Sequence, residues 1–357
     1  MFVERMSVGL DVHARSVVAA AIDTVTEEVI KARLCPAEVL EWVAGLPGTA
    51  AVAYEAGPTG YGLARAFTAV GVRCVVAAPS RLSRPSGDRV KTDARDALLL
   101  ARSLRVSDIV AVRVPSVEQE AARDLVRARD DARSALTTAK HRLTHLALRH
   151  GHVYSGGTPW TQQHLRWFRQ LDFDQAGTRA AFEDAYGMVV FVQTRRDQLD
   201  TQIEQMALNS SFTPMVRRLC CLRGIGTLTG FAIAVELGPD WARFTPTSLA
   251  AFVGLAPGEA SSGDKRVVTS ITKAGNSHVR RLLIEAAWHH KPAYRPSNDM
   301  MRRWNHAPGP VVAAAHRGNK RLHQRWQAFD ARNKKPVIAN TAIARELAGW
   351  CHTLVTL

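Results

Sequence analysis

Four carboxylates stand at places where strands or helices are expected to begin or end. Asp11 lies in an apolar run, Glu55 closes another, and Asp93 and Asp96 are three residues apart, on one face of an expected helix. Carboxylates that converge from separate elements repel one another unless cations bind between them. Mg²⁺ or Mn²⁺ takes carboxylate oxygens, and a pair of such ions assists displacement at a phosphoryl group. We therefore predict that these four residues bind divalent metal and are catalytic.

A second group with chemical potential is a serine stretch in the most basic part of the chain. Residues 257–266 read P-G-E-A-S-S-G-D-K-R, with adjacent Ser261 and Ser262 followed by glycine and then by Lys265 and Arg266. A serine hydroxyl is a nucleophile when it is activated, and the two cations suit a phosphate. The residues alone leave open which serine reacts. We expect this stretch and the four carboxylates to form one active site.

The N-terminal third has the pattern of an α/β domain. Apolar and alternating runs predict strands over residues 6–14, 16–23, 27–34, 49–55 and 72–78. Helices are expected from Pro36 to about residue 44, over 61–70, and from about Asp93. This order is that of the ribonuclease-H-like fold. The basic loop over residues 80–91 leads directly to Asp93, and we expect it to contact phosphate.

The middle third is predicted to be a helical arm. Residues 116–150 lack glycine and proline, and further helices are expected over about 160–171 and 176–208. Long helices of balanced charge favour an antiparallel arm or coiled coil that supports self-association. Trp160 and Trp167 are interpreted as helix-packing residues rather than as base stackers.

The last third is predicted to be mostly helical. Two apolar helices meet at Gly224-Ile225-Gly226, a pattern similar to the helix-hairpin-helix motif, whose freed backbone N–H groups bind phosphate. A short capped helix is expected over residues 244–254, another helix follows the turn that begins at Lys273, and a last one begins near Val337. Basic side chains around the serine stretch are expected to line a nucleic-acid track: Lys265, Arg266, Lys273, Arg280 and Arg281.

Charge and composition narrow the class of protein. The 357 residues carry a formal charge of +15 and a pI of about 10.2. Residues 1–115 have a net charge of +2, residues 116–212 of zero and residues 213–357 of +13, so the last segment carries nearly all of the potential to bind a polyanion. No apolar run is long enough to span a membrane and no signal peptide is evident, so we expect a cytoplasmic protein that acts at the nucleoid. The five cysteines lack a disulfide or C-x-x-C pattern and are expected to be buried free thiols.

Six ordered motifs carry a family resemblance. G-L-D-V-H, A-Y-E-A-G-P-T-G, K-T-D-A-R-D-A, L-R-G-I-G-T-L-T-G, F-V-G-L-A-P-G-E-A-S-S-G and T-K-A-G-N-S-H-V-R-R-L-L-I-E-A-A run over almost the whole chain. Together they resemble the DEDD-type insertion-sequence transposases, the Piv/MooV-like enzymes of insertion-sequence family one-ten. Residues 258–260, G-E-A, depart from relatives in which an aromatic residue often precedes the serine.

The resemblance implies three domains and a mechanism. These are a RuvC-like DEDD domain over residues 1–115, a coiled-coil arm over 116–212 and a transposase domain over 213–357. It implies that Asp11, Glu55, Asp93 and Asp96 form the acidic tetrad and that Ser262, which precedes a glycine, is the nucleophile, with Ser261 as the alternative. It also implies recombination of donor and target DNA guided by a structured bridge RNA, in a dimer that assembles to a tetramer. In that tetramer the RuvC-like domain of one protomer would meet the serine domain of another.

Three other functions remain open from the sequence. A metal-dependent junction resolvase would hydrolyse DNA with water and would not need either serine. A sugar-kinase or actin-like ATPase would use G-L-D-V-H-A-R-S as its first phosphate loop, but no second such loop is present. A non-catalytic DNA- or RNA-binding protein would bind equally well without its carboxylates.

Overall fold

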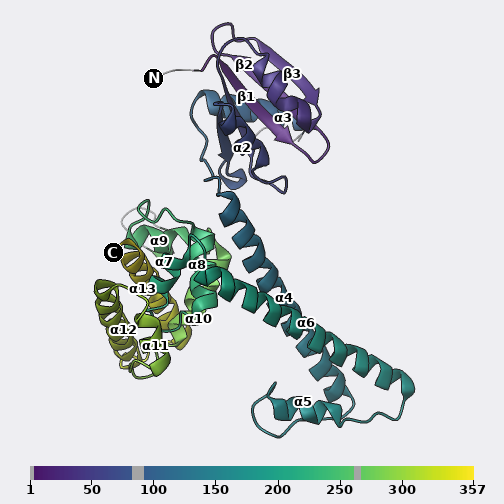
Figure 1. The fold of residues 1–357 in the computed structure, drawn as a ribbon, viewed down its shortest axis with the longest axis vertical. Coiled ribbons are helices and arrows are strands. Elements are labelled where there is room, and N and C mark those ends of the chain that lie inside the picture. The colour runs from purple at the N-terminus through teal and green to yellow at the C-terminus, as the bar shows by residue number, and fades with distance from the viewer. Residues whose placement is uncertain (1–3, 83–91, 261–266) are drawn as a thin grey trace. The chain divides into compact units, whose positions relative to one another are not determined.

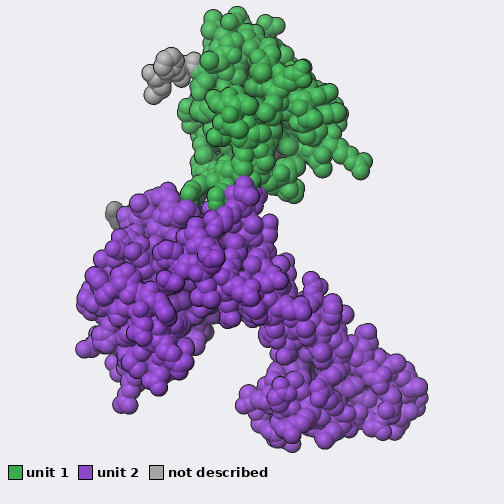
Figure 2. All heavy atoms as spheres, in the orientation of Figure 1, with its two compact units in different colours: residues 1–116 green, residues 117–357 purple. Residues whose placement is uncertain are grey.

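The computed structural model describes residues 4–82, 92–260 and 267–357. Within it the chain divides into two compact units, Met1–Ser116 and Val117–Leu357 (Figure 2). Four predicted site residues lie outside the described residues, Ser261, Ser262, Lys265 and Arg266, and so does most of the basic loop before Asp93. Among the described helices, none combines the length and the apolar character that a membrane crossing requires.

The first unit is built on one mixed sheet. Its strands lie in the order β3-β2-β1-β4-β5, with β1, β2 and β3 antiparallel and with β4 and β5 parallel to β1 (Figure 1). The elements are β1 Met6–Val12, β2 Val17–Asp23, β3 Val29–Leu34, η1 Pro36–Glu38, α1 Val39–Ala44, β4 Ala50–Glu55, α2 Gly62–Ala69, β5 Arg73–Ala77, η2 Pro79–Arg81 and α3 Asp93–Arg105. The predicted α/β class and the order of elements are confirmed, and the sheet is consistent with a ribonuclease-H-like domain.

Two apolar layers hold this sheet. One face packs Met6, Val8 and Leu10 of β1 with Val39 of α1 and Phe67 of α2. The other face packs alanines of β4 and β5 against Leu100 and Leu104 of α3. Because side chains alternate along a strand, the odd-numbered residues of β1 point toward α3.

The second unit begins with two long helices that lie side by side, α4 Val117–Arg149 and α6 Ala176–Leu208, with α5 Gln162–Arg169 at their far end (Figure 1). The predicted long helices are present, and their assembly as a coiled coil stays a prediction. The rest of the unit is helical except for one small hairpin. Its elements are α7 Thr213–Leu219, α8 Thr227–Leu237, α9 Pro246–Phe252, β6 Pro257–Glu259, β7 Val268–Ile271, α10 Ser277–Trp288, α11 Asn298–Trp304, α12 Gly309–Asp330 and α13 Pro336–Thr356.

The core of the second unit joins α4 to the C-terminal helices. Ala122 and Val126 of α4 belong to the same apolar cluster as Phe231 of α8, Leu283 of α10 and Leu347 of α13. The base of the arm is therefore packed into the C-terminal helices.

The cysteines depart from expectation at two positions. Cys220, Cys221 and Cys351 are buried free thiols, and burial raises the pKa of Cys351 to about 12. Cys74 is only partly buried, and the expectation that all five are buried is wrong at Cys35, which is exposed. It precedes the short helix that starts at Pro36, and its backbone N–H donates to the Glu38 carboxylate, 2.8 Å away.

Candidate active site

Asp11 and Glu55 reach the same edge of the sheet on neighbouring strands. The parallel pairing of β1 with β4 matches Leu10 to Tyr54, so the next residues on the two strands are Asp11 and Glu55. Adjacent strands lie about 4.8 Å apart, and residues in the same register point to the same face. Both carboxylates therefore lie on the α3 side, at the end of their strands.

Helix α3 brings the other two carboxylates to this edge. Asp93 and Asp96 occupy its first turn. The helix lies so close to β1 that a Cβ added at Gly9 would stand 2.0 Å from the carbonyl oxygen of Ala97. Ser7 adds a hydrogen bond, donating from its Oγ to the Ala101 carbonyl at 2.9 Å. Two odd-numbered residues of β1 thus fix the helix against the strand that carries Asp11.

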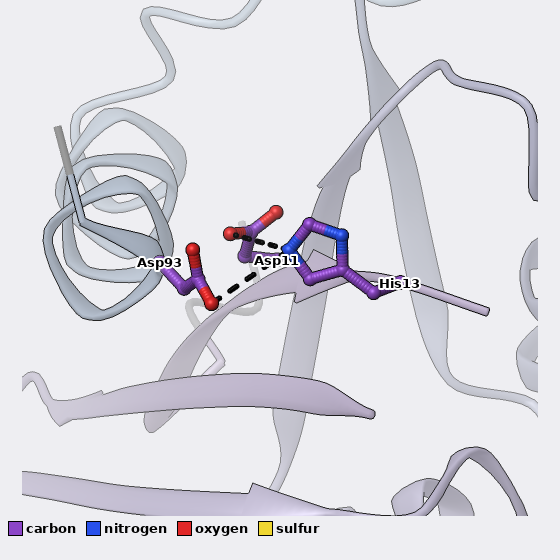
Figure 3. A group of neighbouring side chains, drawn as sticks. All are labelled: Asp11, His13 and Asp93. Carbon is purple, nitrogen blue, oxygen red and sulfur yellow. Dashed lines mark ion pairs between the residues drawn. The ribbon is translucent and has the colours of Figure 1, made fainter. Parts of the chain in front are cut away.

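His13 joins Asp11 and Asp93, as Figure 3 shows. Its Nε2 lies 3.4 Å from Asp11 Oδ2 and 3.8 Å from Asp93 Oδ2. One ligand atom from each of the three residues lies within 4.8 Å of the others. The sequence analysis did not single out His13 as a site residue. The available signal was its spacing, because a residue two positions after Asp11 along an extended chain points to the same side.

A cleft of about 890 Å³ opens at this edge, and Asp11, His13 and Glu55 line it together with the turn at Gly57-Pro58. Roughly half of the His13 and Asp93 side chains is exposed and about a quarter of Asp11, so the group is reachable from solvent. Two carboxylates and an imidazole fit a divalent ion such as Mn²⁺ or Mg²⁺, which prefers oxygen ligands. Among the described residues, Asp11, His13 and Asp93 form the tight group, while Glu55 and Asp96 stand at the same edge without belonging to it.

Comparisons with known proteins identify the family. The family model described as "Transposase IS116/IS110/IS902 family" matches residues 216–300, and the DEDD model of the IS110 transposases matches residues 8–150. A relative from Sinorhizobium fredii that is named as a transposase, y4qE, is 39% identical over 298 residues, which are 83% of this chain and 73% of the relative. The transposase of insertion sequence element IS1533 from Leptospira borgpetersenii is 30% identical over 349 residues, which are 93% of this chain and 98% of the relative. The chain belongs to the IS110/IS116 family of transposases.

Membership places the acidic residues of this transposase in the matched DEDD region, and makes the chain an enzyme of DNA transposition. The predicted family is thus confirmed. The roles of individual site residues stay predictions, and so do guidance by RNA and the oligomeric state.

The serine stretch connects two short strands that the sequence analysis did not predict. β6 and β7 pair antiparallel, with Pro257 opposite Ile271 and Glu259 opposite Val268. Ser261 and Ser262 fall between these strands in the chain, outside the described residues. The described part of the stretch is therefore residues 257–260, which contain β6.

The turn at Gly224-Ile225-Gly226 is tightly packed. Gly224 has a φ of +84°, and a Cβ there would stand 2.4 Å from the Ala286 carbonyl oxygen, so only glycine fits. Gly226 is the N-cap of α8. The Arg303 guanidinium donates to the Ile225 carbonyl at 2.9 Å, which places a positive charge at this turn.

Two residues of the predicted nucleic-acid track, Arg280 and Arg281, contact other residues of the protein. Arg280 donates from Nη1 to the carbonyls of Val253, at 2.9 Å, and Ala274, at 2.8 Å. Arg281 pairs with Asp130 of α4 and with Glu285. Lys273 has a φ of +55°, in the left-handed region, and is exposed. Arg280 thus braces the turn that follows the β6–β7 hairpin.

A buried carboxylate connects the same region to the arm. The Glu236 side chain is 2% exposed and accepts from Arg127 of α4 at 3.0 Å and from Asn276, the N-cap of α10, at 2.8 Å. His278 Nδ1 lies 3.6 Å away. Burial raises the pKa of Glu236, but hydrogen bonds from His278, Arg127 and Asn276 outweigh it and bring the pKa to about 2.

Proposed function

We propose that this transposase cuts and rejoins donor and target DNA with a serine nucleophile and a divalent metal site. The observation that carries the proposal is the gathering of Asp11, Glu55, Asp93 and Asp96 at one edge of the sheet, on the face that α3 covers. Such a group of carboxylates on rigid elements suits chemistry at a phosphodiester.

The metal would be held by Asp11 and Asp93 with His13 beside them, and Glu55 and Asp96 would complete the tetrad. When bound, Mg²⁺ or Mn²⁺ supplies positive charge that stabilises the phosphoryl group during displacement. The protein's own contribution is to hold the carboxylates in fixed positions, through the close packing of α3 on Gly9 and the hydrogen bond of Ser7.

The serine chemistry would proceed in two balanced steps. The Ser262 Oγ loses its proton and forms a bond to phosphorus, while the bond from phosphorus to one deoxyribose oxygen breaks and that oxygen leaves as a hydroxyl. A hydroxyl of the partner strand then attacks the phosphoserine, which restores the serine and forms the new phosphodiester. Bond energy is thereby kept for rejoining. Ser261 is the alternative nucleophile, and Lys265 and Arg266 would steady the strand.

The choice of DNA sites would rest on a bridge RNA, by pairing of one RNA loop with the target and another with the donor. The net charge of +13 over residues 213–357 suits contact with nucleic acid. A phosphate site at the turn of Gly224 and Gly226, together with Lys273, Arg280 and Arg281, would contribute to it. Helices α4 and α6 would form the coiled-coil arm, and dimers would assemble to a tetramer.

A trap for the covalent intermediate tests the chemistry. The protein is mixed with Mg²⁺, labelled donor and target DNA, and RNA transcribed from the sequence beside its gene, and the denatured protein is then analysed for label. We expect an adduct that disappears in Ser262→Ala and in Asp11→Ala. An adduct that survives Ser262→Ala but not Ser261→Ala moves the nucleophile by one residue. Cleaved DNA with no adduct would overturn the proposal in favour of hydrolysis by a junction resolvase.

A further inference from the structure

The far end of the arm contains a second cavity, unrelated to the carboxylates. It measures about 350 Å³ and lies where the end of α4, the following loop and α5 meet. Five ring side chains form one part of its wall: Tyr154, Trp160, His164, Trp167 and Phe168. Such a volume is at the small end of the range for ligand pockets, which are typically apolar with a few polar groups.

Local hydrogen bonds build this wall in advance of any ligand. Thr161 caps α5 by accepting from the His164 N–H, and the Trp160 N–H donates to His164 Nδ1 at 2.8 Å. Because Nδ1 accepts, the neutral ring carries its proton on Nε2 and can donate from there. His164 stacks on Trp167 with ring centres 5.4 Å apart and 22° between the planes. Burial lowers the pKa of His164, which favours this neutral form.

A polar hollow of about 430 Å³ adjoins the aromatic one and shares two of its residues, Tyr154 and Trp167. Its remaining lining is Gly156 and four polar or basic side chains, Ser155, Gln163, Arg166 and Gln170. An apolar aromatic hollow beside a polar one with an arginine matches the two parts of a nucleotide, its base and its sugar-phosphate.

The charged residues of the arm are distributed unevenly along its sequence, in a way that also suits a nucleotide. The net charge of residues 116–212 is zero, but the forty residues from 132 to 171 contain six Lys and Arg, five His and no Asp or Glu. The carboxylates of the arm are all outside this segment. The segment that forms the wall of the cavity therefore contributes positive charge and no carboxylate, which favours an anion.

We propose that the end of the arm binds an unpaired nucleobase of single-stranded RNA or DNA. The base would enter the cavity and stack against its aromatic wall, and Arg166 in the polar hollow would contact its phosphate. Single-stranded nucleic acid is recognised in this way, by stacking on aromatic rings beside a basic groove. Bases in a duplex are already stacked and do not enter. Trp160 and Trp167 pack on the apolar cluster of the arm, as expected from the sequence, and in addition wall this cavity.

Two observations favour a nucleobase over a metal ion or a protein partner at this cavity. Metal binding lacks a site here, because the group of neighbouring ligands found among the described residues is the one at Asp11. An apolar protein partner would not account for a segment of forty residues without a carboxylate. The inference does not depend on the chemistry of Ser262 or Asp11, and it holds or fails separately from the proposed function.

Photocrosslinking of the full-length Asp11→Asn protein, which should leave DNA uncut, tests the site. Single-stranded RNA containing 4-thiouridine and single-stranded DNA containing 4-thiothymidine are crosslinked, and the modified residues are mapped by mass spectrometry. We expect crosslinks at Tyr154, Trp160 or Trp167 with single strands and none there with duplexes of the same length. The two probes show whether RNA, DNA or both are bound. Crosslinks that map only elsewhere would overturn the proposal.

Affinity measured by fluorescence anisotropy adds matched variants. Trp167→Ala should weaken binding of single strands about tenfold, since stacking is worth roughly that or more per base, and leave duplex binding unchanged. Trp167→Phe should retain most of the affinity. Phe191→Ala, which removes an exposed ring from α6 outside the cavity, is the control and should have no effect. Equal losses in Trp167→Ala and Phe191→Ala would contradict the proposal. If Trp167→Ala does not fold, the crosslinks and the affinity of Arg166→Gln for single strands still test the proposal. Arg195→Gln, at an exposed position on α6, is the control for Arg166→Gln and should bind like the wild type.

Discussion

Replacing Glu236 by glutamine would remove one charge from a buried network and little else. The side chain is 2% exposed and lies among Arg127, Asn276 and His278, so an uncharged amide of the same shape leaves Arg127 without its ionic partner. Arg123 and Gln119 of α4 donate to main-chain carbonyls of the same helix end, at Val235 and Glu236, and would remain. The substitution therefore tests the contribution of the Glu236 charge to stability, separately from the other hydrogen bonds at this helix end.

The pKa of Glu236 gives the size of the effect. It falls from 4.5 to about 2 in the folded protein, and each pKa unit corresponds to ~1.4 kcal/mol, so the charge stabilises folding by about 3 kcal/mol at neutral pH. Because the folded pKa is the lower one, this stabilisation is complete above pH 4.5 and is lost as the pH falls toward 2. Linkage predicts that roughly 2 kcal/mol of it has gone at pH 3.

Urea unfolding followed by tryptophan fluorescence measures this effect in the second unit, which contains seven of the eight tryptophans. We expect Glu236→Gln to lower the free energy of unfolding by about 3 kcal/mol at pH 7 and by only about 1 kcal/mol at pH 3. Glu183→Gln, at an exposed position on α6, is the matched control and should change little at either pH. A difference between wild type and Glu236→Gln that stays constant from pH 7 to pH 3 would refute the argument.

Three further predictions concern the carboxylate edge. Asp11→Asn should reduce Mg²⁺-dependent DNA cleavage at least about 100-fold without lowering the melting temperature, and an active variant would exclude Asp11 from the metal site. His13→Ala should weaken Mn²⁺ binding, measured by calorimetry, about 10-fold, whereas Arg15→Ala, close by in the chain and exposed, should not. Gly9→Ala should destabilise the first unit by about 1–3 kcal/mol and weaken Mn²⁺ binding too, since the added methyl group meets the α3 backbone; an unchanged melting temperature would contradict that packing.

Much of the carboxylate edge could be predicted from the sequence because its signals are local. Asp11 lies in an apolar run that predicts a strand, Glu55 closes another, and the spacing of Asp93 and Asp96 places both in one turn of a helix. That these strands are neighbours in one sheet followed from the order of elements. The register that sets Asp11 beside Glu55 is a pairing between chain segments more than forty residues apart, and it came from the structure.

Other features depend on contacts that no local pattern encodes. The guanidinium of Arg280, whose contact with nucleic acid stays a prediction, holds two carbonyls of neighbouring turns, and this interaction depends on how α9 and α10 meet. The hairpin of β6 and β7 has strands of three and four residues, too short for an alternating pattern to predict them. At the end of the arm the aromatic residues were visible in the sequence, yet only the folded loop shows that they surround a cavity.

The length of α4 turns the arm into a spacer. A helix of 33 residues is about 50 Å long, at 1.5 Å per residue. For a duplex that ends in an unpaired nucleotide held at the tip, that length corresponds to roughly 15 base pairs, at 3.4 Å each. A nucleic acid held at the tip and also at the C-terminal helices must span this distance, so shorter molecules can engage only one of the two. The length of the arm would then select nucleic acids by their length, and oligonucleotides should bind more tightly once they exceed it.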